Sequence, residues 1–199
     1  MEIFGSEKAF QPLTVGDLEV NDVHVIRDGG LIALPERDDK GRGLIFTDIT
    51  KWHNGKYVMN RVAFYIAHIM LEDVEVQRRG IVLIQAFTPS FSIKHFDRKV
   101  NNRMMQTFLN ALPVRIVGTH FIGYSMVSQL VLPFVLHTMG PHQRYRARIH
   151  SGSNESVMSH LREFGITRAM IPTRAGGLLG MNTAAWLDER LSHESQVAS

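Results

Sequence analysis

No Asp, Glu, Lys or Arg occurs between Ile116 and Gln143, and this uncharged stretch limits what the chain can fold into. A helix that crosses a bilayer needs about 20 consecutive, mostly apolar residues. Here Gly118 and Gly123 interrupt the first half of the stretch, and Pro133 lies in its most apolar part. We therefore expect two buried elements of a globular core, a strand followed by a helix, rather than a membrane span.

The composition is that of an ordinary globular domain. Of the 199 residues, 44% are hydrophobic and 21% are charged, and the net charge is +3. This is enough apolar material for one core and too little charge for a general polyanion-coating role. The chain has no cysteine, which excludes disulfides, thiolate metal sites and cysteine nucleophiles. The length of 199 residues predicts a single domain. The first residues lack the features of a secretory signal, so we expect this domain in the cytoplasm.

Strand and helix patterns alternate along the chain. Short runs of consecutive apolar residues predict buried strands, and apolar residues at helical spacing predict helices. The extended segments are 31–35, 44–49, 81–84, 114–122 and 148–150, and the helices are 61–76, 92–112, 126–139 and 156–164. This alternation predicts an α/β fold with a mostly parallel sheet and covering helices. A polar run at 36–41 is the expected turn between the first two extended segments.

The predicted helix at 126–139 has almost no polar face. Such a helix is most often a buried core helix. In a chain this short, however, few layers exist to cover every side, so the alternative is a helix that walls a ligand cavity or touches a bilayer. Pro133 cannot donate a backbone hydrogen bond and would permit a hinge within this helix.

Three arginines follow that helix closely, namely Arg144, Arg146 and Arg148. All three share a face in an extended segment, and Arg144 and Arg148 share one in a helix. The planar guanidinium suits phosphate groups, because it can donate two parallel hydrogen bonds. A solvated charged turn is the alternative explanation. An apolar helix beside an arginine cluster is nevertheless typical of proteins that touch lipid surfaces.

A serine hydrolase is a remote alternative. The segment Gly123-Tyr124-Ser125-Met126-Val127 lies between a predicted strand and a predicted helix, but Val127 replaces the second glycine of a nucleophile elbow. Asp188 and His193 follow in triad order only five positions apart, which is poor triad geometry. We expect His120 to be a hydrogen-bonded core histidine. No catalytic residue is therefore predicted, and the protein is not expected to be an enzyme.

Metal, cofactor and nucleic-acid sites are not indicated either. The ten histidines show no ligand spacing such as H-E-x-x-H. No glycine-rich phosphate-binding pattern occurs, so no nucleotide cofactor is expected. Basic residues are not interleaved with aromatic residues along a strand, which argues against a nucleic-acid partner.

Several segments carry a recognisable set of motifs. Residues 112–122 contain the pattern P-x-R-x-x-x-x-H, which includes Arg115 and His120. Leu132-Pro133-Phe134-Val135, Arg148-Ile149-His150-Ser151-Gly152 and Ile171-Pro172 with Gly176-Gly177 follow in that order. Taken together, these segments resemble the CRAL-TRIO lipid-binding domain, the family of the cellular retinaldehyde-binding and alpha-tocopherol transfer proteins. The resemblance spans about residues 23–178.

The resemblance implies an α/β domain at residues 23–178 that encloses a hydrophobic ligand pocket, with the apolar helix as a movable lid. An arm at 1–22 would precede the domain, and a helix or tail at 179–199 would follow it. The side chains expected to line the pocket are Ile84, Phe87, Ile116, Phe121, Ile122, Val127, Leu130, Val131, Phe134 and Val135.

The resemblance also implies a membrane partner. In the tocopherol-transfer branch, a basic groove binds phosphoinositide head groups and couples membrane docking to ligand release. The matching positions are Arg115, Arg144, Arg146 and Arg148, whereas a further basic position of that branch is Val117 here. We therefore expect a monomeric carrier of a tocopherol-like, retinoid-like or phospholipid-like molecule that associates transiently with membranes. The alternative is a phosphoinositide-binding or protein-interaction module without carrier activity.

Overall fold

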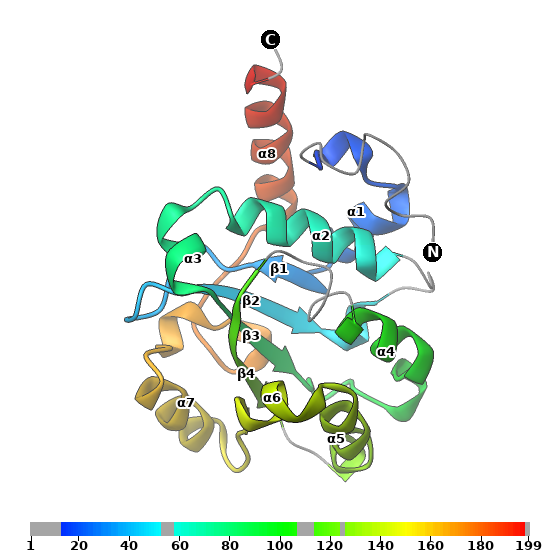
Figure 1. The fold of residues 1–199 in the computed structure, drawn as a ribbon, viewed down its shortest axis with the longest axis vertical. Coiled ribbons are helices and arrows are strands. Elements are labelled where there is room, and N and C mark those ends of the chain that lie inside the picture. Colours follow the sequence, from blue (N-terminus) through cyan, green and yellow to red (C-terminus); the bar gives the residue numbers. More distant parts are fainter. Residues whose placement is uncertain (1–12, 53–57, 107–113, 124–125, 198–199) are drawn as a thin grey trace.

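The computed structural model describes residues 13–52, 58–106, 114–123 and 126–197. A five-stranded sheet forms its central layer, with helices on both faces (Figure 1). In spatial order the strands are β1 (Leu31–Ala33), β2 (Gly43–Asp48), β3 (Ile81–Ala86), β4 (Ile116–Ile122) and β5 (Ala147–Ile149). Strand β1 pairs antiparallel with β2, and the other neighbours are parallel. The predicted α/β fold with a mostly parallel sheet is confirmed.

The helices divide between the two faces of the sheet. Residues of α1, α2 and α5 share the larger apolar core with one face, and residues of α7 share the smaller core with the other. The described helices are α1 (Val20–Arg27), α2 (Val58–Met70), α3 (Val74–Arg79), α4 (Arg98–Gln106), α5 (Met126–Thr138), α6 (Gly140–Tyr145), α7 (Asn154–Glu163) and α8 (Thr183–Val197), with short 3-10 turns between some of them.

Alternation along the strands explains why there are two cores. Within β2, Ile45 packs on the side of α2, whereas Leu44 and Phe46 pack on the side of α7. All three are fully buried, as expected for a strand of a parallel sheet that is covered on both faces. Each such side chain contributes about 1.5–3 kcal/mol through burial.

The single helix predicted for residues 61–76 is wrong, because the chain forms two helices there. Helix α2 ends at Met70, and the carboxylate of Asp73 starts α3 by accepting hydrogen bonds from the backbone N–H groups of Glu75 (2.8 Å) and Val76 (3.4 Å). An N-cap of this kind satisfies donors that would otherwise lack partners. Helix α3 then ends at Arg79, and the next residue, Gly80, has a φ of +88°. A Cβ at Gly80 would lie 2.5 Å from the backbone oxygen of Arg115.

The helix predicted for residues 92–112 starts later than expected. A short 3-10 turn covers Ile93–His95, and α4 begins at Arg98. The carboxylate of Asp97 caps α4 by accepting a hydrogen bond of 2.7 Å from the backbone N–H of Lys99. Residues 107–112 lie outside the described part of the chain. The predicted helices at 126–139 and 156–164 are confirmed to within two residues at each end.

Helix α8 extends away from the layered body (Figure 1). Leu187 of α8 is buried in the larger core, and the Glu194 carboxylate adds polar contacts by accepting hydrogen bonds from the Val15 backbone N–H (2.6 Å) and the Tyr65 hydroxyl (3.1 Å). Arg190 adds an ion pair of 2.7 Å to Glu72, which lies in the turn between α2 and α3. Helix α1 runs across the predicted boundary between residues 22 and 23. Within the described residues, no helix combines the length and apolarity that a membrane span requires.

Candidate functional site

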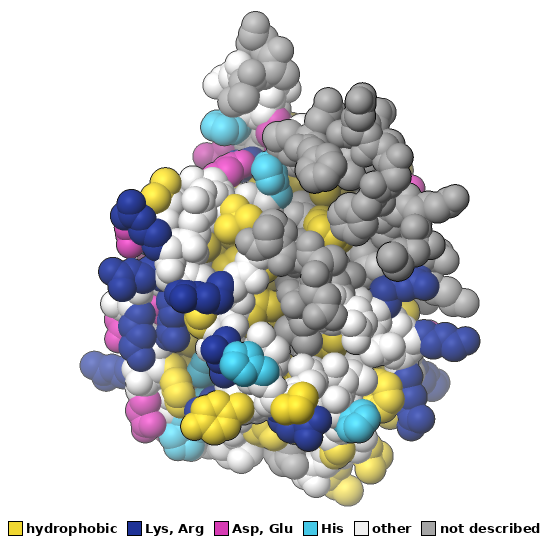
Figure 2. All heavy atoms as spheres, in the orientation of Figure 1, with side chains coloured by type: hydrophobic (Ala, Val, Ile, Leu, Met, Phe, Trp, Pro, Cys, Tyr) yellow, Lys and Arg dark blue, Asp and Glu magenta, His cyan; other side chains and the backbone are white. Residues whose placement is uncertain are grey.

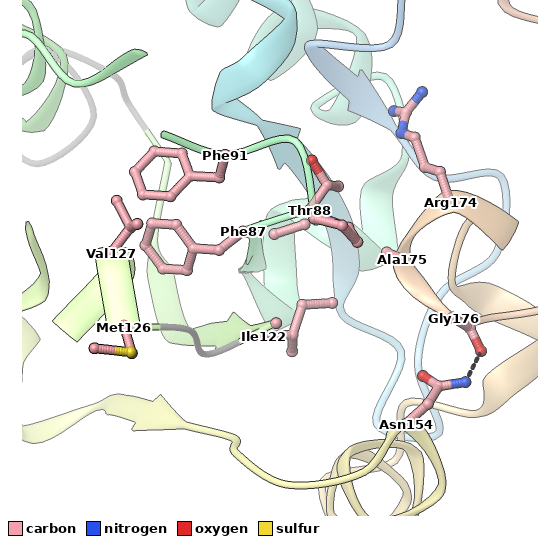
Figure 3. A pocket seen from close by; sticks show the side chains of 13 residues that line it. Phe87, Thr88, Phe91, Ile122, Met126, Val127, Asn154, Arg174, Ala175 and Gly176 are labelled. Atoms are coloured by element: carbon pink, nitrogen blue, oxygen red, sulfur yellow. Dashed lines mark hydrogen bonds between the residues drawn. The ribbon is translucent and has the colours of Figure 1, made fainter. Parts of the chain in front are cut away.

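The carboxyl ends of β3 and β4 open into a cavity of about 570 Å³ (Figure 3). The strand ends Ala86 and Ile122, the loop after β3, the first turn of α5, the first residue of α7 and the turn at 174–176 line it. Ligands of parallel α/β sheets bind in the crevice outside the carboxyl ends of the strands. This cavity is therefore the candidate ligand site.

One side of the cavity is apolar. Phe87 and Phe91 come from the loop after β3, and their rings meet edge to face with centroids 4.9 Å apart. Met126 and Val127 face them from the first turn of α5 (Figure 3). Gly123, with a φ of +75°, lets the end of β4 pass close to the carbonyl oxygen of Phe87, where a Cβ would collide. The end of β4 and the aromatic loop thereby lie close together.

The other side of the cavity is polar. The Asn154 side-chain amide donates a hydrogen bond of 2.9 Å to the Gly176 carbonyl, and Thr88 and Arg174 lie nearby (Figure 3). Arg174 Nε lies 3.7 Å from a carboxylate oxygen of Asp48. Burial lowers the pKa of Arg174, and Asp48 opposes this shift. The cavity is thus lined by polar groups at one end and by apolar side chains at the other.

Three of the ten predicted pocket residues line this cavity, namely Phe87, Ile122 and Val127. Ile116, Phe121, Val131 and Val135 are buried in the larger core, and Ile84 is buried in the smaller one. Phe134 is half-buried against Phe96, and Leu130 is 75% exposed.

Sequence reasoning missed the other ten residues that line the cavity, among them Phe91, Met126 and Arg174. Arg174 lies inside the Ile171-Pro172 to Gly176-Gly177 segment, so the motif marked its position but not its role. Phe91 lies in the loop after β3. The apolar run at residues 81–84 predicts the strand, but it does not indicate the path of the loop that follows.

Helix α5 has one apolar side that packs in the core and further apolar residues that are exposed. Val131, Leu132 and Val135 are buried against the sheet, whereas Met126 is 83% exposed at the cavity. Pro133 lies within the helix and is exposed. The packed side confirms that α5 is a covering helix, and its exposed apolar residues lie at the foot of the molecule as drawn in Figure 2.

Two of the predicted arginines, Arg115 and Arg146, lie near the amino ends of the strands, at the opposite end of the sheet from the cavity. Arg115 precedes β4 and donates hydrogen bonds to the carbonyls of Arg78 and Arg79, which precede β3. Arg146 precedes β5 and donates to the carbonyl of Ile116 at the start of β4 (3.1 Å). Because these strands are parallel, their amino ends share one edge. Figure 2 shows Lys and Arg side chains gathered on the side that carries α3.

Arg144 and Arg148 occupy different positions. Arg144 donates hydrogen bonds to the carbonyls of Leu136 (2.9 Å) and His137 (3.4 Å) at the end of α5. Arg148 lies within β5 and extends toward α7, with its guanidinium 6.0 Å from the centroid of the Phe164 ring. The structure thus brings Arg115 and Arg146 together at the amino ends of the strands. Arg144 lies at the end of α5, and Arg148 lies on the side of the sheet that α7 covers.

His120 is confirmed as a hydrogen-bonded core histidine. It is 3% exposed, and its Nδ1 lies 2.8 Å from Nε2 of His150. Burial lowers the pKa of His120 to about 3 and also lowers that of His150. Ser125, the candidate hydrolase nucleophile, lies outside the described residues. Within them, no group of three His, Asp or Glu side chains could hold a metal ion.

Comparison with known proteins places this architecture in a family. The model of the CRAL/TRIO domain matches residues 27–177, whereas no curated protein matches significantly. Among solved structures, the one titled "Crystal structure of Sfh5" is similar with a TM-score of 0.50 and 9% identity. The alignment covers 65% of this chain and 52% of that one, so this chain spans about half the length of that protein. The domain match over residues 27–177 shows that the chain belongs to the CRAL/TRIO domain family, a family of lipid-binding and lipid-transfer domains.

Proposed function

We propose that this chain binds one small hydrophobic lipid, of the tocopherol, retinoid or phospholipid kind, and exchanges it at membranes that contain phosphoinositides. The observation that carries the proposal is the cavity at the carboxyl ends of β3 and β4. Its volume of about 570 Å³ falls within the range of small-molecule sites, about 300–1,000 Å³. Membership of a lipid-binding family supports the same class of ligand.

The two walls of the cavity suit an amphiphilic molecule. Its apolar part would lie against Phe87, Phe91 and the first turn of α5, and its polar end would face Asn154 and Arg174. Movement of α5 about Pro133 would open the site, since proline interrupts the hydrogen bonds of the helix at that point.

The proposed phosphoinositide site uses Arg115, Arg144, Arg146 and Arg148. A phosphate group that binds the guanidinium of Arg144 would compete with the carbonyls of Leu136 and His137 at the end of α5. The other end of α5 lines the cavity through Met126. Head-group binding and ligand exchange would therefore be linked through one helix.

A transfer assay between vesicles with and without a phosphoinositide tests this function. We expect Arg144→Ala/Arg148→Ala to lose phosphoinositide binding and to slow transfer of a fluorescent tocopherol or phospholipid probe. Lys94→Ala/Lys99→Ala removes the same charge from exposed positions elsewhere and is the matched control. Absence of transfer by the unmodified protein, together with unchanged phosphoinositide binding in the arginine variant, would overturn the proposal. Phosphoinositide binding without uptake of any probe would instead support a module without carrier activity.

A further inference from the structure

Three histidines lie in a row at the β5 edge of the sheet. His120 on β4 and His150 after β5 are 3% and 4% exposed, and their rings stack with centroids 5.1 Å apart. His160 on α7 is exposed, and its ring centroid lies 6.2 Å from that of His150. The ring of Phe164 meets both buried imidazoles edge-on. A buried imidazole pair is thus separated from solvent by one exposed histidine and one aromatic ring.

The contact between the two buried rings limits how many protons they can hold. The Nδ1 of His120 and the Nε2 of His150 are 2.8 Å apart, so one nitrogen must donate and the other must accept. One extra proton leaves this hydrogen bond possible, because a charged imidazole can donate to a neutral one. A second extra proton places two N–H groups against each other and breaks the contact.

The charged groups around the pair oppose protonation. Arg42 and Arg148 act on His120, and His160 and Arg148 act on His150. Among the groups that act on the pair, Glu163 favours a positive charge, through His150. With burial added, both imidazoles are neutral at pH 7, and the pair acts as an uncharged hydrogen-bonded contact.

A short stretch of chain connects this contact to the candidate site. Strand β5 is three residues long, lies at the edge of the sheet and pairs with β4. Three residues after His150, Ser153 caps α7 by accepting a hydrogen bond from the backbone N–H of Ser156. The next residue, Asn154, lines the cavity and bonds the Gly176 carbonyl. Asn154 thus lies four residues after His150 at the polar wall of the cavity, so we expect a displacement of His150 to reach it.

We propose that the His120–His150 pair is an acid-sensitive contact that holds β5 and the start of α7 in place at neutral pH and releases them as the pH falls. The consequence for ligand release rests on the proposed function, whereas the release of β5 and α7 does not. Anionic membrane surfaces attract cations, including protons, so such a contact would favour opening where exchange takes place.

Hydrogen exchange of the protein without ligand tests the contact itself. Corrected for intrinsic rates, exchange in residues 147–163 should rise about tenfold between pH 7.5 and pH 5, and exchange in β3 should not. The variant His120→Asn/His150→Gln places amide groups where the two bonded nitrogens lie and cannot titrate, so its exchange should not depend on pH. His24→Gln removes an exposed histidine from α1 and should behave as the unmodified protein.

A second measurement, on the unmodified protein, tests the proposal even if that variant does not fold. Imidazole nitrogen shifts of the unmodified protein should show two histidines that remain neutral well below pH 6.5. The proposal is wrong if exchange in residues 147–163 is the same at both pH values, or if all ten histidines titrate near 6.5. Acid-dependent exchange without acid-dependent release of a fluorescent fatty-acid probe would support the contact and contradict only its link to ligand release.

Discussion

The guanidinium of Arg144 donates a hydrogen bond of 2.9 Å to the carbonyl of Leu136, and thereby joins the arginine-rich segment to the end of α5. Carbonyls in the last turn of a helix lack partners within the helix, and a cation there also interacts favourably with the helix dipole. Arg144 thus has a structural role in the absence of any phosphate group.

Arg144→Ala should therefore loosen the end of α5. We expect a loss of about 1 kcal/mol in the local opening free energy, measured by hydrogen exchange at residues 136–140. Arg148→Ala is the control, because Arg148 bonds the carbonyls of Tyr145 and Ala147 close to its own position. Equal protection in the two variants would show that Arg144 does not hold α5.

Pro133 supplies the second test of α5. Pro133→Ala restores a backbone N–H and removes an interior proline, so we expect a more stable helix and slower exchange of a bound probe. Stopped-flow measurement of probe dissociation compares the variant with the unmodified protein. A helix that gains stability without any slowing of dissociation would show that α5 does not bend to release the ligand.

The ion pair between the buried Asp22 and the partly exposed Arg61 predicts an effect on stability. Asp22 is fully buried, and its carboxylate lies 2.7 Å from Nε of Arg61. Arg61→Leu leaves the buried carboxylate without its cation, which should cost about 2–3 kcal/mol in urea unfolding, less than for a fully buried pair because Arg61 is partly exposed. Arg37→Leu breaks the exposed pair with Asp73 and should cost less than about 1 kcal/mol. Similar losses in both variants would contradict this assignment.

Stability should also depend on pH through the buried imidazoles. Burial lowers the pKa of His120 to about 3 and also lowers that of His150, so the unfolded chain binds protons that the folded chain does not. The stabilisation is present above the unfolded pKa of about 6.5 and is lost as the pH falls from there toward about 3. Urea unfolding between pH 7.5 and pH 4 should show a flatter profile for His120→Asn/His150→Gln. An unchanged profile would assign the acid sensitivity to other groups.

The fold follows from local patterns more readily than the site does. Runs such as Ile81–Ile84 are buried on both faces, so their apolar character alone predicts a covered parallel strand. The break between α2 and α3 is less visible, because the apolar spacing continues through it while Asp73 starts a new helix. Capping by a short polar side chain outweighed periodicity there.

The candidate site depends on contacts between distant segments, which the spacing of apolar residues does not predict. Val131 and Leu130 are neighbours on an apolar helix, yet Val131 is buried and Leu130 is exposed, because only one side of α5 meets the sheet. Arg174 reaches the cavity from a segment far along the chain, and it is placed by contacts with Asp48 and the Asp28 carbonyl. Such contacts arise from the assembled fold.

The central claim is that the cavity beside the start of α5 holds one hydrophobic ligand. Met126 and Leu130 are both exposed apolar residues of α5, but Met126 lines the cavity, whereas Leu130 is not among its lining residues. Native mass spectrometry of the purified protein with Met126→Trp and Leu130→Trp tests the claim most directly. We predict one bound lipid in the unmodified protein and in Leu130→Trp, and its loss in Met126→Trp. An absence of bound lipid in the unmodified protein after incubation with lipid extract, or equal binding in both variants, would contradict the account.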